Sequence, residues 1–389
     1  MLDDFGQRIR DIILSEMDLS RELSDEEICD LIGSVVSREA RDRPMTIKDR
    51  AELERTIFNS LRKLDVLQEL VDDRDVTEIM VNGPNDIFYE KAGRIQRFKG
   101  HFSSEEKLED VIQQIVGRHN RVVNQASPIV DTRLSDGSRV NIVLNPISIG
   151  GSAVSIRKFP EHPMSMERLV EIEALSPEVA RLLQILTQAK YNIFISGGTG
   201  SGKTTFLNAL SQYIPDDERI ITIEDSAELQ LLGAKNIVRL ETRNANTDGV
   251  TPITIRDLIR TALRMRPDRI IVGECRGAEA LDMLQAMNTG HDGSLSTGHA
   301  NSPHDIISRI ETMVLQGQDF PLNAIRQQIA SGIDIIVQLG RLRDKSRRVL
   351  EISEVDGFMD GEIVLHTLYR FEETAVLDSG RIQGFLKKA

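Results

Sequence analysis

The chain has 389 residues, of which 40% are hydrophobic and 28% charged, and its formal net charge is −13. This length suits two or three domains of an ordinary soluble protein, and the two cysteines, Cys29 and Cys275, are too few for a disulfide framework or a four-thiolate zinc site. The acidic balance argues against direct binding of nucleic acid, because no basic excess exists to displace counterions from phosphates. No apolar run approaches the ~20 residues of a membrane-spanning helix. The start, MLDDFGQRIRD, lacks the pattern of a secretory signal, so we expect a cytoplasmic protein.

Residues 1–70 are predicted to form a helical N-terminal extension. Apolar residues recur there at helical spacing, first at Ile9, Ile12 and Ile13 and again at Leu64 and Leu67. Proline and glycine are scarce within these runs, which supports the prediction.

Residues 71–160 are predicted to form a compact α+β domain. Strand patterns at 77–81 and 87–89 are separated by the turn NGPND, and a helix is expected over 104–119. Two short strands on either side of SDG, the second ending near Val143, and a third at 153–159 complete this unit.

Residues 161–389 are predicted to form an α/β domain with a largely parallel sheet. The segment PEHPMSMERL, rich in proline, is interpreted as the linker that precedes it. Short β-branched runs at 191–196, 220–223 and 270–272 alternate with helical patterns, which is typical of buried parallel strands.

A glycine-rich segment lies between the strand predicted at 191–196 and the helix predicted to follow it. It fits the pattern Gly-x-x-x-x-Gly-Lys-Thr of a phosphate-binding loop in full. Its glycines let several backbone N–H groups point at one phosphate, and the following helix presents its positive end there. Lys203 then neutralises phosphate oxygens, and the Thr204 hydroxyl is a Mg²⁺ ligand. We predict that ATP with Mg²⁺ is bound by Gly197, Gly198, Thr199, Gly200, Ser201, Gly202, Lys203, Thr204 and Thr205.

Carboxylates follow two of the predicted strands. Glu224 and Glu228 come directly after the strand at 220–223, and Glu274 follows the strand at 270–272 as Gly-Glu, in the place of the usual aspartate. The carboxyl ends of parallel strands form the ligand-binding edge of such a sheet. These groups are therefore candidates for the Mg²⁺ shell and for orienting the attacking water. Glu224 and Glu274 both suit the role of metal ligand and of water-activating base, and the sequence does not separate them.

Two histidines, His291 and His299, lie among small residues in the segment TGHDGSLSTGHA. Nothing bulky nearby would bury them as core histidines, and further ligands at the usual spacing of a zinc site are missing. We interpret the segment as a sensor of the γ-phosphate.

The order of these motifs resembles that of the type II/IV secretion ATPase superfamily. The matching stretches are GGTGSGKTT, ITIEDSAELQL and RMRPDRIIVGECRGAEALDMLQAMNTGHDGSLSTGHANS. Upstream, TEIMVNGPNDIFYEKAGRI, DTRLSDGSRVN and SIRKF are similar to the N-terminal domain of the tight-adherence (Tad/Flp) pilus assembly ATPases of the CpaF type. The tetracysteine zinc module of some type II secretion and type IV pilus ATPases is absent from the sequence.

The resemblance implies a homo-hexameric motor. Each subunit would have an N-terminal α+β domain and a RecA-like P-loop ATPase domain, with ATP held between them. It also implies that Glu224, Glu228 and Glu274 serve the acidic boxes, that His291 and His299 form the histidine box, and that arginines of the N-terminal domain contact the γ-phosphate. Arg133, Arg139 and Arg157 are the candidates for that last role, which a charge-assisted hydrogen bond suits, although each also suits a structural salt bridge.

The expected function is Mg²⁺-dependent ATP hydrolysis that powers assembly or retraction of a Tad/Flp-type pilus. The motor would lie in the cytoplasm, attached to the inner face of the membrane through an inner-membrane platform protein. The alternatives are a type IV secretion ATPase of the same fold, which moves protein or DNA, and a nucleotide-binding regulator that does not hydrolyse ATP. The acidic boxes count against the regulator, because a sensor needs no water-activating carboxylate.

Overall fold

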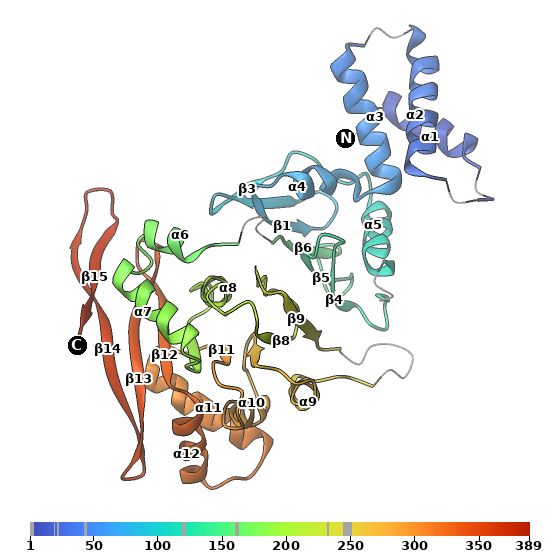
Figure 1. Cartoon of the computed structure of the whole chain (residues 1–389). Helices are drawn as coiled ribbons and strands as arrows, with labels where there is room; N and C mark the ends of the chain where they lie inside the picture. Colours follow the sequence, from blue (N-terminus) through green and yellow to red (C-terminus); the bar gives the residue numbers. More distant parts are fainter. Residues whose placement is uncertain are drawn as a thin grey trace. The chain divides into compact units, whose positions relative to one another are not determined.

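The computed structural model describes residues 4–18, 20–21, 23–42, 45–118, 122–159, 163–231, 233–243 and 251–389. The chain divides into two compact units, residues 1–161 and 162–389. Figure 1 follows it from the N-terminal helices to the C-terminal strands. No helix in these described ranges is long and apolar enough to cross a membrane.

The first unit begins with helices, as predicted. They are α1 (Asp4–Glu16), α2 (Asp25–Glu39) and α3 (Ile47–Arg62), with a 3-10 turn at Ala40–Asp42. Capping boxes start two of them: Ser24 with Glu27 at α2, and Thr46 with Asp49 at α3. The three helices share an apolar cluster of their own, made by Ile9, Ile13, Ile28, Ile32, Val35, Val36 and Ile57.

An antiparallel sheet covered by a helix forms the rest of the first unit. A 3-10 turn (Asp65–Leu67) and α4 (Gln68–Asp72) lead into strands whose order in the sheet is β3-β2-β1-β6-β5-β4. The helix α5 (Glu105–Gly117) presents Leu108, Ile112 and Ile115 to the apolar cluster of this sheet, which confirms the α+β prediction. The strands are β1 (Val76–Asn82), β2 (Ile87–Lys91), β3 (Arg94–Arg97), β4 (Ile129–Arg133), β5 (Arg139–Val143) and β6 (Ala153–Arg157).

The second unit is built on a larger sheet with the order β15-β14-β13-β12-β7-β11-β10-β8-β9. The strands from β12 to β9 in this order run parallel, and β13 to β15 run antiparallel. The parallel strands are β7 (Ile193–Gly197), β8 (Arg219–Glu224), β9 (Asn236–Glu241), β10 (Arg269–Val272), β11 (Leu295–Gly298) and β12 (Ile335–Arg341). The parallel sheet and its strands at β7, β8 and β10 are thus confirmed.

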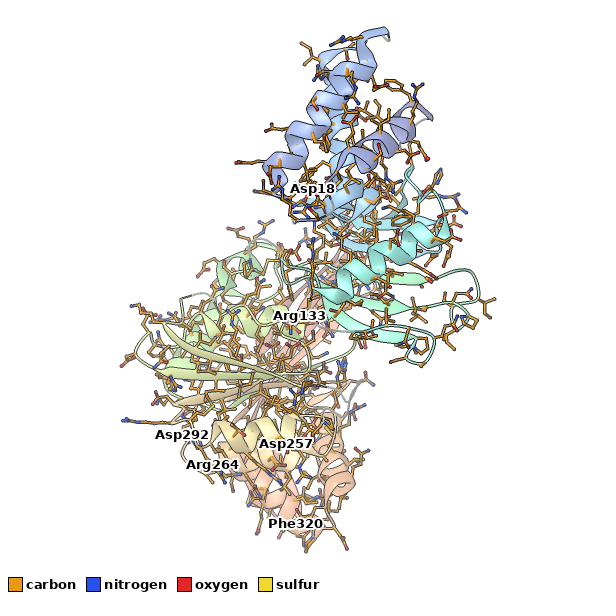
Figure 2. The ribbon with its side chains drawn as sticks, turned by 90° about the vertical axis from the view of Figure 1, so that its right-hand side faces the viewer. Asp18, Arg133, Asp257, Arg264, Asp292 and Phe320 are labelled. Atoms are coloured by element: carbon orange, nitrogen blue, oxygen red, sulfur yellow. The ribbon has the colours of Figure 1, made fainter. Side chains whose placement is uncertain are left out.

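Helices cover both faces of this sheet, because the buried strands are apolar on both sides. On β7, Phe194 faces one apolar cluster, whereas Ile193 and Ile195 face the other. The first cluster holds α9 (Ile255–Ala262), α10 (Glu279–Met287), α11 (Pro303–Gly317) and α12 (Leu322–Gly332); the second holds α6 (Met166–Glu171), α7 (Pro177–Gln188) and α8 (Lys203–Ser211). Figure 2 labels Asp257 on α9 and Phe320 between α11 and α12.

Two details differ from the sequence prediction. The segment interpreted as a linker contains the start of α6, because Ser165 caps a short amphipathic helix that buries Met166 and Leu169. Its residues 160–162 lie outside the described residues. The long antiparallel flank of β13 (Arg347–Met359), β14 (Glu362–Val376) and β15 (Ile382–Lys388), red in Figure 1, was not predicted.

Candidate nucleotide-binding site

The glycine-rich loop joins β7 to α8 and has the backbone geometry of a phosphate cradle. Gly200 and Gly202 have φ values of +72° and +95°, which L side chains rarely adopt. A Cβ on Gly197 would lie 2.5 Å from Ser201 Oγ and 2.7 Å from Leu339 O, so this position too requires glycine. Among the described residues, no side chain caps the first turn of α8, whose N-cap residue is Gly202. The backbone N–H groups of that turn are therefore available to bind an anion. The residues present therefore fit a nucleotide phosphate.

Lys203 is folded back onto this loop. Its Nζ donates to Gly197 O at 3.1 Å and Gly198 O at 3.2 Å, and lies 3.2 Å from His299 Nδ1. The residue is 8% exposed, and burial lowers the pKa of its ammonium, with Glu274 opposing that shift. A phosphate would compete with the loop carbonyls for this ammonium.

Glu274 and His299 lie beside the loop because β10 and β11 end there. His299 Nε2 lies 2.7 Å from Glu274 Oε1, and Arg276 Nη2 lies 2.7 Å from Glu274 Oε2. Burial lowers the pKa of His299, which favours the neutral imidazole. A neutral imidazole accepts from Lys203 at Nδ1 only if its proton sits on Nε2, which faces Glu274. Lys203, His299, Glu274 and Arg276 thus form a polar chain of close contacts, in which the 2.7 Å contact of His299 with Glu274 lacks hydrogen-bond geometry, since Glu274 Oε1 has no hydrogen-bond partner among the described residues.

The charge of Glu274 is held in place by its neighbours. Burial acts to raise the pKa of this carboxyl, but the hydrogen bond and charge of Arg276, together with His299 and Lys203, outweigh burial and lower it. Glu274 is therefore a carboxylate at neutral pH. Arg276 was not singled out from the sequence, although a cation two residues beyond a strand-end carboxylate is a signal for this contact.

Glu224 occupies a different environment at the end of β8. It is 4% exposed, and its Oε2 accepts from the backbone N–H of Glu228 at 2.7 Å and of Leu229 at 2.9 Å. Its Oε1 is buried without a hydrogen-bond partner among the described residues. A Cβ on Gly273 would lie 2.8 Å from Glu224 Cγ. The Glu224 side chain thus occupies the space that a side chain at position 273 would need, which explains the glycine before Glu274. Through its two backbone hydrogen bonds, Glu224 also stabilises the turn that carries Glu228.

The ionisation of Glu224 is expected to make stability depend on pH. Burial raises the pKa of the Glu224 carboxyl to about 7 from its ordinary value of 4.5, although the two backbone N–H groups act to lower it. Between these two pKa values the folded protein retains a proton that the unfolded chain releases. The free energy of unfolding therefore falls as the pH rises from about 4.5 to about 7. Glutamine does not titrate, so Glu224→Gln should not lose this stability. Its free energy of unfolding, relative to that of wild type, should therefore increase by roughly 1–3 kcal/mol as the pH is raised from about 5 to about 8. Urea unfolding of both proteins measures this difference, and a pH-independent difference would contradict the assignment.

His291 is separated from this group in the second unit. It precedes β11, whereas His299 follows it, so the two histidines lie at opposite ends of one strand. Ser294 N donates to Asn192 Oδ1 at 2.9 Å at the end where β7 and β11 begin, away from the glycine-rich loop. There His291 Nδ1 lies 3.1 Å from Ala286 O, a contact that fixes a loop.

Among the other predicted ligands, Thr204 lies in the first turn of α8 and is half-buried, and Glu228 is half-buried in the turn after β8. The described residues hold no group of three or more His, Cys, Asp or Glu side chains able to bind a metal. Thr204, at the start of α8 beside the glycine-rich loop, fits the role of a Mg²⁺ ligand that shares the ion with the phosphates of a bound nucleotide.

The three predicted arginines of the first unit lie in one row. Arg133 on β4 is paired with Arg139 on β5, which is paired with Arg157 on β6. Their strand neighbours, such as Val140 and Ile156, are buried in the core, so the arginines lie on the opposite face of the sheet. Figure 2 labels Arg133. Register thus gathers three residues that are far apart in sequence.

Comparison with known proteins gives the family. The model of the type II/IV secretion system protein family matches residues 60–376. The chain belongs to this family. A Mycobacterium tuberculosis protein named for conjugal transfer is 33% identical over 80% of this chain and 91% of its own length. The type IV secretion system protein PtlH of Bordetella pertussis is also 33% identical, over 76% of this chain and 94% of PtlH.

The fold is also that of solved members of this type II/IV secretion family. The pilus retraction motor PilT with bound ADP has a TM-score of 0.56 and 23% identity, over 79% of this chain and 82% of PilT. This confirms the RecA-like fold with a preceding N-terminal domain. The family match begins at residue 60, so α1, α2 and most of α3 lie outside it. The relatives are named for conjugal transfer and type IV secretion, so the Tad/Flp branch stays a prediction.

Proposed function

We propose that the protein is a Mg²⁺-dependent ATPase. The observation that carries this proposal is the polar chain from Lys203 of the glycine-rich loop through His299 to Glu274. It sets a phosphate-binding cation and a charged carboxylate at one sheet edge, which is the pairing that hydrolysis of a bound triphosphate requires.

Bound ATP with Mg²⁺ would supply the scissile phosphoanhydride bond and a counter-charge for its oxygens. Lys203 would exchange its contacts with Gly197 O and Gly198 O for phosphate oxygens. Glu274 would accept a hydrogen bond from the attacking water, and Arg276 would hold its orientation. His299, which contacts Lys203 through Nδ1 and Glu274 through Nε2, would couple the position of Glu274 to the binding of phosphate by Lys203. Glu224, which is buried and committed to backbone N–H groups, is assigned a positioning role for the acidic turn.

We further propose a ring of six subunits, in which the row of Arg133, Arg139 and Arg157 supplies γ-phosphate contacts. Guanidinium groups suit this role because they form charge-assisted hydrogen bonds to phosphate. The ring would act at the inner face of the cell membrane by binding a platform protein of the machine that it drives.

The machine is proposed to be a Tad/Flp-type pilus or a related secretion apparatus. Similarity of the upstream stretches to Tad/Flp pilus ATPases supports the pilus. The names of the two relatives support the alternative, a type IV secretion or conjugation motor. Deletion of the gene in its host distinguishes them: loss of surface filaments supports the pilus, and loss of DNA or protein transfer with filaments intact supports the alternative.

If the active form of the ATPase is a ring, its rate of hydrolysis per subunit should depend on the protein concentration. We expect the phosphate-release rate per subunit to rise more steeply than in proportion as subunits assemble, and then to level off. The measurement is Mg²⁺-dependent phosphate release across a dilution series, with light scattering to report mass. A constant rate per subunit through the assembly transition would contradict the ring, and absence of turnover at every concentration would favour the non-hydrolysing regulator.

A further inference from the structure

An arginine from the C-terminal flank lies against the glycine-rich loop. Arg347, the first residue of β13, donates from Nε to Gly200 O at 2.9 Å. A Cβ on Gly202 would lie 3.5 Å from Arg347 Cδ, so the side chain crosses the start of α8. Its side chain is exposed, and its Nη atoms have no hydrogen-bond partner in the part of the chain that the structure describes. A forked donor is thus left open beside the phosphate cradle.

The sheet order tells which end of a nucleotide this arginine meets. β7, which carries the loop, lies between β11 and β12, and Arg347 pairs with Arg341 at the end of β12. Glu274 and His299 follow β10 and β11 on the other side of β7. A triphosphate whose γ end lies at Glu274 therefore has its α end directed toward β12 and Arg347.

We propose that Arg347 binds the α-phosphate of the nucleotide. This inference rests on the proposed ATPase function and adds to it a residue that contacts ADP and ATP alike. Guanidinium binds phosphate through paired charge-assisted hydrogen bonds, and one such interaction changes affinity about tenfold or more. Because Arg347 lies away from the γ-phosphate side, it contributes to binding and not to the chemical step.

The test is Arg347→Ala in the full chain. We expect the dissociation constant for ADP and the KM for ATP to rise by the same factor, about tenfold or more, with kcat within about twofold. The melting temperature of the nucleotide-free protein should stay unchanged, while its rise on adding ADP shrinks. Arg347→Lys keeps the positive charge but loses the forked guanidinium. Its dissociation constant for ADP and its KM for ATP should lie between those of wild type and Arg347→Ala. Arg343→Ala is the matched control, because Arg343 lies in the turn between β12 and β13, close to Arg347 in the sequence, and pairs with Glu373.

Competition by AMP and by adenosine separates the α-phosphate from the rest of the nucleotide. Arg347→Ala should weaken inhibition by AMP and leave inhibition by adenosine unchanged. Equal weakening of both would overturn the phosphate assignment, and a fall in kcat with unchanged KM would show that Arg347 only shapes the loop. If wild type binds and hydrolyses ATP while Arg347→Ala matches it, this inference alone fails. If wild type binds no ADP, the proposed function fails with it.

Discussion

Replacing Lys203 by alanine is expected to abolish ATP hydrolysis. The ammonium is the cation that the loop offers to the β and γ oxygens, and its removal leaves their charge uncompensated in a largely buried place. We expect turnover to fall at least about a hundredfold, with weaker ATP binding. Phosphate release and binding of a fluorescent ATP analogue measure the two effects.

The control for this variant is Lys235→Ala. Lys235 is an exposed lysine paired with Asp216, so its loss removes a charge without touching the loop. Lys203 also donates hydrogen bonds to Gly197 O and Gly198 O, so its removal could disturb the loop. Circular dichroism of the Lys203→Ala protein therefore checks that it is folded. Full turnover by a folded Lys203→Ala protein would disprove the ATPase assignment.

Replacing Glu274 by glutamine is expected to stop hydrolysis and preserve ATP binding. Glutamine keeps the shape of the side chain, but it has no charge and one acceptor fewer for the attacking water, Arg276 and His299. A loss of roughly a hundredfold to ten-thousandfold in kcat is typical of a removed general base. Single-turnover phosphate release and retention of labelled ATP measure the two properties.

Glu224→Gln is the informative comparison for this variant. The sequence left these two carboxylates as competitors for one role, and the structure supports Glu274. Glu224→Gln should retain most of the turnover, whereas Glu274→Gln should not. Glu362→Gln, at an exposed glutamate paired with Arg326, is the neutral control. The reverse ranking of Glu224 and Glu274 would overturn their assigned roles.

Local patterns predicted much of the fold because they are set by short-range physics. Runs such as Ile270 to Val272 are β-branched and apolar on both sides, which only a buried strand between two helical layers accommodates. The loop at 197–205 was predicted in the same way, because positive φ at Gly202 and the lysine after it are requirements that leave a pattern in the sequence.

Other features depend on pairing across the sheet and leave no local pattern. Arg347 is separated from Gly200 by 147 positions, and only the order of β12 and β13 brings them together. The two histidines share one motif, yet β11 lies between them and places them at opposite ends. The long strands β13 and β14 alternate only loosely between buried and exposed residues, so their periodicity was weak.

The contact between Gly273 and Glu224 makes two distant motifs a single packing unit. Any side chain at position 273 would meet Glu224 Cγ, so alanine or aspartate is tolerated there only if the residue at 224 becomes smaller. Substitutions at the two positions should therefore be strongly non-additive. Engineering a conventional strand-end aspartate into this protein would have to begin with a smaller residue at position 224, and a change confined to position 273 would fail for steric reasons before chemical ones.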